Sequence, residues 1–232
     1  MIPLRDNLPT RRAPIVTLLL IGINAYVFLR VFWLGSYGGQ RYMLYYGLIP
    51  CSLTGSCQVT GRAFSPEVTL LTSMFVHAGF FHFAGNMLYL WIFGNNVEDS
   101  MGRVRFIVFY LLCGLAAAYG QVLVGPGSRI PMVGASGAIS GVLGAYLLLF
   151  PHARVLTLIP LGFFIQMAEI RAVFVLGFWI IIQLLNGFLT FSHEGGGVAW
   201  FAHIGGFVVG CVLIGLFKRR TVPWGWRRYR SF

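Results

Sequence analysis

The segment SGAISGVLGAYLLLF, residues 136–150, decides how this chain folds. It is almost wholly apolar, begins at Ser136 and is closed by Pro151, which is the pattern of a helix inside a bilayer. It is also short, because a membrane-spanning helix needs roughly 20 apolar residues. A short helix with a polar start is tolerated in a membrane only where other protein segments or an internal cavity surround it.

Apolar segments on both sides of residues 136–150 extend this pattern. Apolar residues make up 57% of the chain and charged residues 10%, against about 25% charged residues in soluble domains. We therefore predict an all-α membrane protein, a six-transmembrane-helix bundle over residues 14–217 with a long outer loop at 35–79, between tails at 1–13 and 218–232. The other predicted spans are Pro14–Leu34, Phe80–Val97 (interrupted by His82 and Asn86), Val104–Val124, Ala172–Leu189 and Ala199–Phe217.

The positive charges predict the orientation of the bundle. The chain carries a net charge of +11, and of its 17 Lys and Arg residues nine lie in the two tails and four in loops on the same side. The positive-inside rule places that side in the cytoplasm. We expect a multi-pass protein of a bacterial inner (cell) membrane with both termini cytoplasmic, whose basic flanks meet anionic lipid in the bilayer. Nucleic acid is not expected as a partner, because the cations are confined to short flanks.

Two loop features leave alternatives open. Leu156–Ile170 is apolar but broken by Pro160 and Gly162, so we predict a surface or partly inserted segment rather than a seventh span. Cys51 and Cys57 share the outer loop, where they can form a disulfide in an oxidising compartment or remain thiols. The remaining cysteines, Cys113 and Cys211, are expected inside helices.

Three polar motifs fall at one depth of the predicted bundle. They are HFAGN at 82–86, GASG at 134–137 and AHIGG at 202–206, near the starts of the second, fourth and sixth spans. These spans run inward, and the motifs differ by about 6 Å along the bilayer normal at 1.5 Å rise per residue. We therefore expect the motifs to meet a short way below the outer surface.

Small residues on two spans favour contact between Ser136 and His203. Glycines at three- and four-residue spacing allow membrane helices to approach closely, and His203 shares the small face of the sixth span. A packing role alone is the simpler interpretation of these residues, which are Gly137, Gly141, Gly144, Gly206 and Gly210.

Acyl transfer suits this set of residues. A neutral imidazole can take the proton of a serine hydroxyl, so Ser136 is the candidate nucleophile and His203 the candidate base. The Ser136 N–H at a helix start, with His82 and Asn86, can supply donors to an oxyanion. No carboxylate is expected nearby, so we predict a Ser–His dyad. The alternatives are a helix cap for Ser136, a helix–helix hydrogen bond for His82 and Asn86, and a three-histidine metal site that would add His77; no metal is expected.

The three motifs together resemble those of rhomboid intramembrane serine proteases, over nearly the whole chain. The resemblance implies that Ser136 is the nucleophile and His203 the base, that His82, Asn86 and Gly134 belong to the oxyanion site, and that the fifth span is a lateral gate. It implies cleavage of transmembrane segments of single-pass membrane proteins, without a cofactor. It also implies supporting roles for His77, Gly137, Gly206 and Gly210, and matches Glu98 to an acidic residue at the inner end of the second span.

Two departures and two rival functions qualify this resemblance. Some members stack an aromatic residue on the base from one turn after the nucleophile, where this chain has Ser140, and a Trp-Arg pair of the outer loop is absent. The main rival is a catalytically inactive relative that binds membrane helices. A transporter is the other, but internal repeats are not visible.

Overall fold

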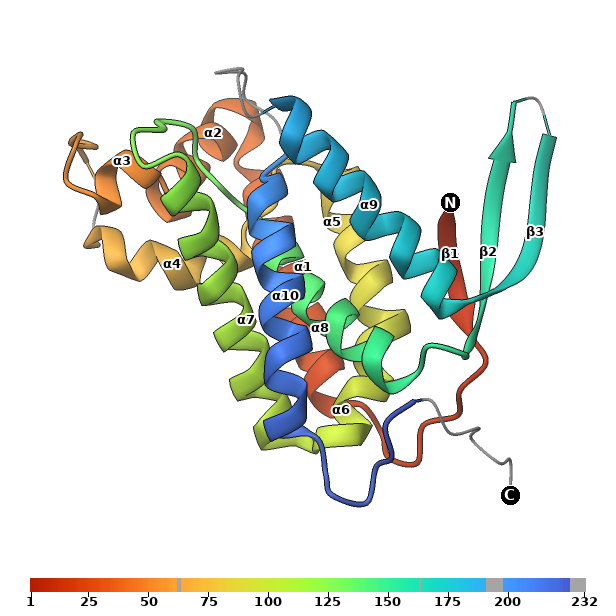
Figure 1. Ribbon diagram of the computed structural model, residues 1–232. Coiled ribbons are helices and arrows are strands. Elements are labelled where there is room, and N and C mark those ends of the chain that lie inside the picture. Colours follow the sequence, from red (N-terminus) through yellow and green to blue (C-terminus); the bar gives the residue numbers. More distant parts are fainter. Residues whose placement is uncertain (62–63, 163, 191–197, 226–232) are drawn as a thin grey trace.

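The computed structural model describes residues 1–61, 64–162, 164–190 and 198–225, most of them helical (Figure 1). Among these described residues, four helices are long and apolar enough to cross a bilayer: α1 (Ile15–Trp33), α7 (Arg103–Val124), α9 (Ala172–Thr190) and α10 (Trp200–Phe217). A fifth span is possible where Pro66–Phe75 and Phe80–Met101 form a bent pair, and the apolar helix α8 (Ser136–Leu149) is shorter. The predicted helical membrane class is confirmed.

The second predicted span is continuous despite its polar residues. It consists of α5 (Phe80–Tyr89), a π-helical turn η3 (Leu90–Gly94) and α6 (Asn95–Met101). Gly102, whose φ of 89° suits glycine, ends it. Glu98 is buried near its end, and its carboxylate accepts N–H groups of Val16 (3.1 Å) and Thr17 (2.8 Å). The Glu98 side chain, on α6, therefore caps the unpaired backbone amides at the start of α1.

We call the end of the bundle at which α1 begins and α10 finishes the tail end, and the opposite end the loop end. The outer loop covers the loop end with α2 (Gly35–Tyr46), α3 (Pro50–Leu53) and a bent run of η1 (Pro66–Val68), α4 (Thr69–Thr72) and η2 (Ser73–Phe75). Leu48 and Met132 exchange two backbone hydrogen bonds of 3.0 and 2.7 Å, and Cys51 is disulfide-bonded to Cys57. The loop is thereby tied to the segment that leads into α8.

A three-stranded antiparallel sheet, which lies beside the helical bundle in Figure 1, was not predicted. Its order is β1 (Ile2–Asp6), β2 (Arg154–Leu161) and β3 (Phe164–Arg171). The segment that we expected to be a surface or partly inserted stretch is the β2–β3 hairpin, which projects from the bundle in Figure 1 and turns at Gly162 with φ 63°. The predicted tail at 1–13 contributes β1, because this strand hydrogen-bonds to the edge of β2.

Helices α7, α8 and α10 pack together through small residues, which positions the polar motifs. A methyl group on Gly206 would collide with the carbonyl oxygen of Gly137, and one on Gly210 with that of Gly141. On the other side of the contact, a methyl group on Gly144 would collide with the carbonyl oxygen of Phe207. The α8 and α10 backbones are therefore in direct contact, as small-residue faces allow between membrane helices.

Candidate active site

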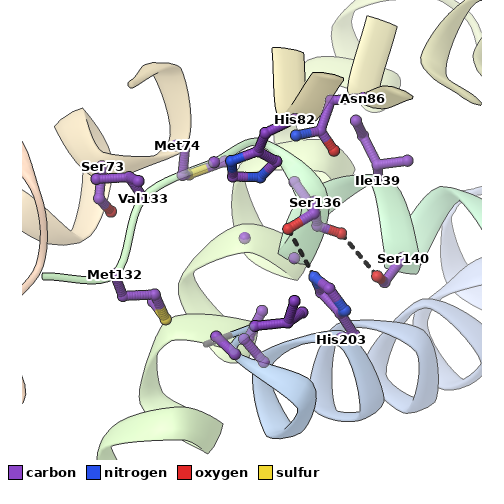
Figure 2. A pocket seen from close by; sticks show the side chains of 18 of the residues that line it. Ser73, Met74, His82, Asn86, Met132, Val133, Ser136, Ile139, Ser140 and His203 are labelled. Atoms are coloured by element: carbon purple, nitrogen blue, oxygen red, sulfur yellow. Dashed lines mark hydrogen bonds between the residues drawn. The ribbon is translucent and has the colours of Figure 1, made fainter. Parts of the chain in front are cut away.

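Ser136 and His203 form a hydrogen bond across the α8–α10 contact. Ser136 is the first residue of α8, and His203 lies in the first turn of α10. The distance between Ser136 Oγ and His203 Nε2 is 2.7 Å (Figure 2). Each residue is partly exposed, and both line a cavity of about 610 Å³. The geometry is that of a hydroxyl whose proton a neighbouring imidazole can accept.

Gln183 of α9 is a third member of this constellation, and the sequence analysis did not identify it. Its Oε1 lies 2.8 Å from His203 Nδ1, and the side chain is 5% exposed. A carbonyl oxygen can only accept a hydrogen bond, so His203 carries its proton on Nδ1. The Nε2 lone pair is then free to accept the Ser136 hydroxyl proton. Gln183 is one of two amides in this mostly apolar span, and that was the available signal, since polar groups at membrane depth are functional suspects.

Aromatic side chains contact His203 from helices other than α8. Ser140 occupies the position one turn after Ser136 and donates its hydroxyl to the Ser136 carbonyl at 2.6 Å. The ring of Trp179, on α9, lies 6.0 Å from the imidazole centroid, and that of Trp200 lies 6.4 Å away and edge-on. The His203 imidazole is therefore flanked by two indole rings and hydrogen-bonded to an amide, and no aromatic residue stands at position 140 of α8.

Asn86 and His82 lie on the opposite side of Ser136 from His203 (Figure 2). Asn86 is only 7% exposed, and its buried Nδ2 donor has no hydrogen-bond partner among the described residues. A buried donor without an acceptor costs free energy, so its retention beside a cavity is consistent with a ligand oxygen as partner. Both residues lie one turn apart on α5, which presents them together.

Gly134 brings the chain before α8 against these side chains. Its φ of 123° lies in the region that favours glycine. A methyl group at Gly134 would lie 2.7 Å from His82 Nε2 and 3.6 Å from Asn86 Nδ2. Its N–H donates to the Ser73 carbonyl at 2.9 Å and is therefore already engaged. Gly134 thus shapes the pocket through its missing side chain, whereas the Ser136 amide at the start of α8 is the nearby backbone donor.

His77 packs against His82 from the turn between η2 and α5. The side chain is 1% exposed, and its ring packs edge-on against that of His82 with centroids 5.2 Å apart. Among the described residues no group of three His, Cys, Asp or Glu side chains is placed to hold a metal ion.

Comparison with known proteins assigns the same part of the chain to one family. Residues 66–220 match the rhomboid domain. The chain is 33% identical over 192 residues to RHOMBOID-like protein 1 of Arabidopsis thaliana, covering 76% of this chain and 45% of that protein. It is 35% identical over 141 residues to rhomboid protease GluP of Bacillus subtilis (61% and 24%), and 35% identical over 94 residues to mitochondrial rhomboid protein 1 of Saccharomyces cerevisiae (39% and 27%). The aligned part is thus less than half of each of these relatives.

Proposed function

Because the chain belongs to the rhomboid family, we propose that it is an intramembrane serine endopeptidase that cleaves transmembrane segments of single-pass membrane proteins. The observation that carries this proposal is the 2.7 Å hydrogen bond between Ser136 and His203 in a cavity among apolar helices. A serine or a histidine alone would not indicate a reaction. A nucleophile and a base within hydrogen-bonding distance of each other are what acyl transfer requires.

In the proposed reaction, Ser136 Oγ attacks the scissile carbonyl while His203 Nε2 takes the hydroxyl proton. The imidazolium then gives that proton to the leaving amine, and water hydrolyses the acyl-enzyme with His203 acting again as base. Asn86 Nδ2, His82 and the Ser136 amide stabilise the oxyanion. Gln183 is a positioning residue, since it contacts His203 and does not itself line the cavity.

The orientation of the protein belongs to the same proposal. The tail end carries most of the cations and is placed in the cytoplasm of a bacterial cell, while the loop end faces the oxidising side. The Cys51–Cys57 disulfide at the loop end supports this placement, because disulfides persist in oxidising compartments. Substrate helices then enter beside α9, whose Phe174, Phe178 and Phe188 are exposed, and are cut near the outer face.

A catalytically inactive helix-binding relative is the alternative, and one experiment separates the two. A fluorophosphonate probe should label the wild-type protein at Ser136, fail with Ser136→Ala, and label His203→Ala at a small fraction of the wild-type rate. The wild-type protein should cleave a model transmembrane substrate, and both variants should not. Labelling independent of both side chains, or full cleavage by either variant at unchanged folding, would refute the dyad.

A further inference from the structure

A second cavity of about 570 Å³ lies at the tail end of the bundle. It is formed where the chain before α1, the α6–α7 junction and the chain after α10 meet, and it shares no lining residue with the catalytic cavity. Four arginines from these separate segments line it: Arg12, Arg103, Arg105 and Arg219.

Arg219 is held in this cavity by the turn between α6 and α7. Its backbone N–H donates to the Ser100 carbonyl at 2.9 Å. A Cβ atom at Gly102 would lie 2.8 Å from the Arg219 Nη2 atom, so the absence of a side chain there makes room for the guanidinium. Gly102 also has a φ of 89°, which disfavours any other residue. The position of this charge is therefore part of the fold.

The carboxylates near the arginines are engaged elsewhere. Both oxygens of Glu98 accept N–H groups at the start of α1, and Asp99 Oδ2 accepts the backbone N–H of Arg11 at 2.9 Å. Within the part of the chain that the structure describes, none of the four arginines has an ion-pair partner. The lining of the cavity thus contains four arginines and only two carboxylates, each of which accepts backbone N–H groups, so the cavity has an excess of positive charge.

We propose that this cavity binds the phosphate group of an anionic phospholipid headgroup. The guanidinium fork matches phosphate oxygens in pairs, and basic pockets between membrane helices on the cytoplasmic side are suited to lipid headgroups. This site is independent of the proposed proteolysis, because it depends on none of the residues around Ser136.

Apolar residues beside the arginines favour a lipid over free phosphate as the source of this group. Val104 lines the cavity and is 75% exposed, and Ile107 and Val108 on the next turn of α7 are also exposed. A lipid whose headgroup sits between the arginines can lay its acyl chains over these side chains, which inorganic phosphate would leave bare.

The test is retention of lipid by the full chain in nanodiscs of phosphatidylcholine with or without phosphatidylglycerol, read by native mass spectrometry. Wild-type protein should keep a bound phosphatidylglycerol, and the Arg103→Gln/Arg219→Gln double variant should bind it about 10-fold more weakly or worse, the equivalent of one charge-assisted hydrogen bond. The matched control is Arg5→Gln/Arg171→Gln, which removes the same charge from exposed positions of the sheet. It should bind as the wild type does.

Equal loss of lipid in both double variants would replace the site with general charge attraction, and no loss in the cavity variant would show that these arginines do not bind the lipid. Unfolding midpoints in phosphatidylcholine alone should agree for all three proteins, which shows that the variants fold. Inorganic phosphate in detergent should stabilise the wild-type protein less than phosphatidylglycerol does. If phosphate stabilises it equally, the lipid assignment is wrong and the ligand is a free anion.

Discussion

At the scale of single residues, the hydrogen bond between Gln183 and His203 answers the question raised by Ser140. The imidazole has no aromatic neighbour on α8 to stack on, and it is oriented instead by an amide of α9 at 2.8 Å. In serine proteases with a triad, a carboxylate in this position both orients the imidazole and stabilises its protonated form. Gln183 can do the first but, being neutral, stabilises the imidazolium less strongly.

Replacing Gln183 should therefore change kcat more than KM. Gln183→Leu removes the acceptor, and we expect kcat to fall roughly 10- to 100-fold, part of the 10²–10⁴ that a positioned general base supplies. Gln183→Glu keeps an acceptor at the same place and should retain activity. Its pH–rate profile should have the acid limb moved to higher pH, because a carboxylate favours the protonated imidazole. Cleavage rates of a transmembrane substrate across pH measure both effects, and a Leu variant with wild-type kcat would show that Gln183 is structural only.

At the scale of helices and strands, hydropathy predicted the spans well and the sheet not at all. The five spans other than Phe80–Val97 begin and end within one residue of the predicted positions, and Pro14, Gly102 and Pro151 mark three of these ends locally. The sheet depends on pairing between Ile2–Asp6 and Arg154–Leu161, which are far apart in the chain, so no local period reveals it. Gln183 is not evident from the sequence for a related reason, since its partner lies on another helix and the usual third member of such a site is a carboxylate.

The contact between α8 and α10 can be tested with two glycines of the same helix. Gly210→Ala places a methyl group against the carbonyl of Gly141, so we expect the free energy of unfolding to fall by roughly 1–3 kcal/mol, the usual cost of overpacking, and activity to fall with it. Gly215→Ala is the matched control, because its methyl group would meet only Trp224 at 3.7 Å. Titration with denaturing detergent measures both. Equal stabilities would argue against direct backbone contact.

At the scale of the whole molecule, Asp6 joins three distant parts of the chain at the tail end. Its Oδ2 accepts hydrogen bonds from Asn96 of α6 at 2.7 Å and from the Tyr146 hydroxyl of α8 at 2.6 Å. These bonds hold β1, and with it the sheet, against the helices. Burial raises the pKa of Asp6 to about 6 and outweighs the opposite effect of the Tyr146 hydrogen bond.

This raised pKa predicts how stability depends on pH. Between the ordinary value near 3.8 and about 6, the folded protein binds a proton at Asp6 that the unfolded chain has lost. The free energy of unfolding contributed by this group is therefore fully present below pH 3.8 and falls as pH rises through 6. Unfolding midpoints recorded across this range should show the decline in the wild type and a flatter profile in Asp6→Asn. An unchanged slope in the variant would assign the dependence to other groups.

The location of Gln183 on α9 has a consequence for the order of events in the proposed reaction. The helix that borders the proposed substrate path, α9, also orients the His203 imidazole through Gln183. Displacing α9 to admit a substrate helix would therefore break this hydrogen bond while the substrate enters. Substrate entry and peptide-bond cleavage then become successive steps, and a substrate helix that keeps α9 displaced is not cleaved. Such an arrangement would select substrates by their residence time in the cavity, favouring segments that enter far enough for α9 to return to its original position.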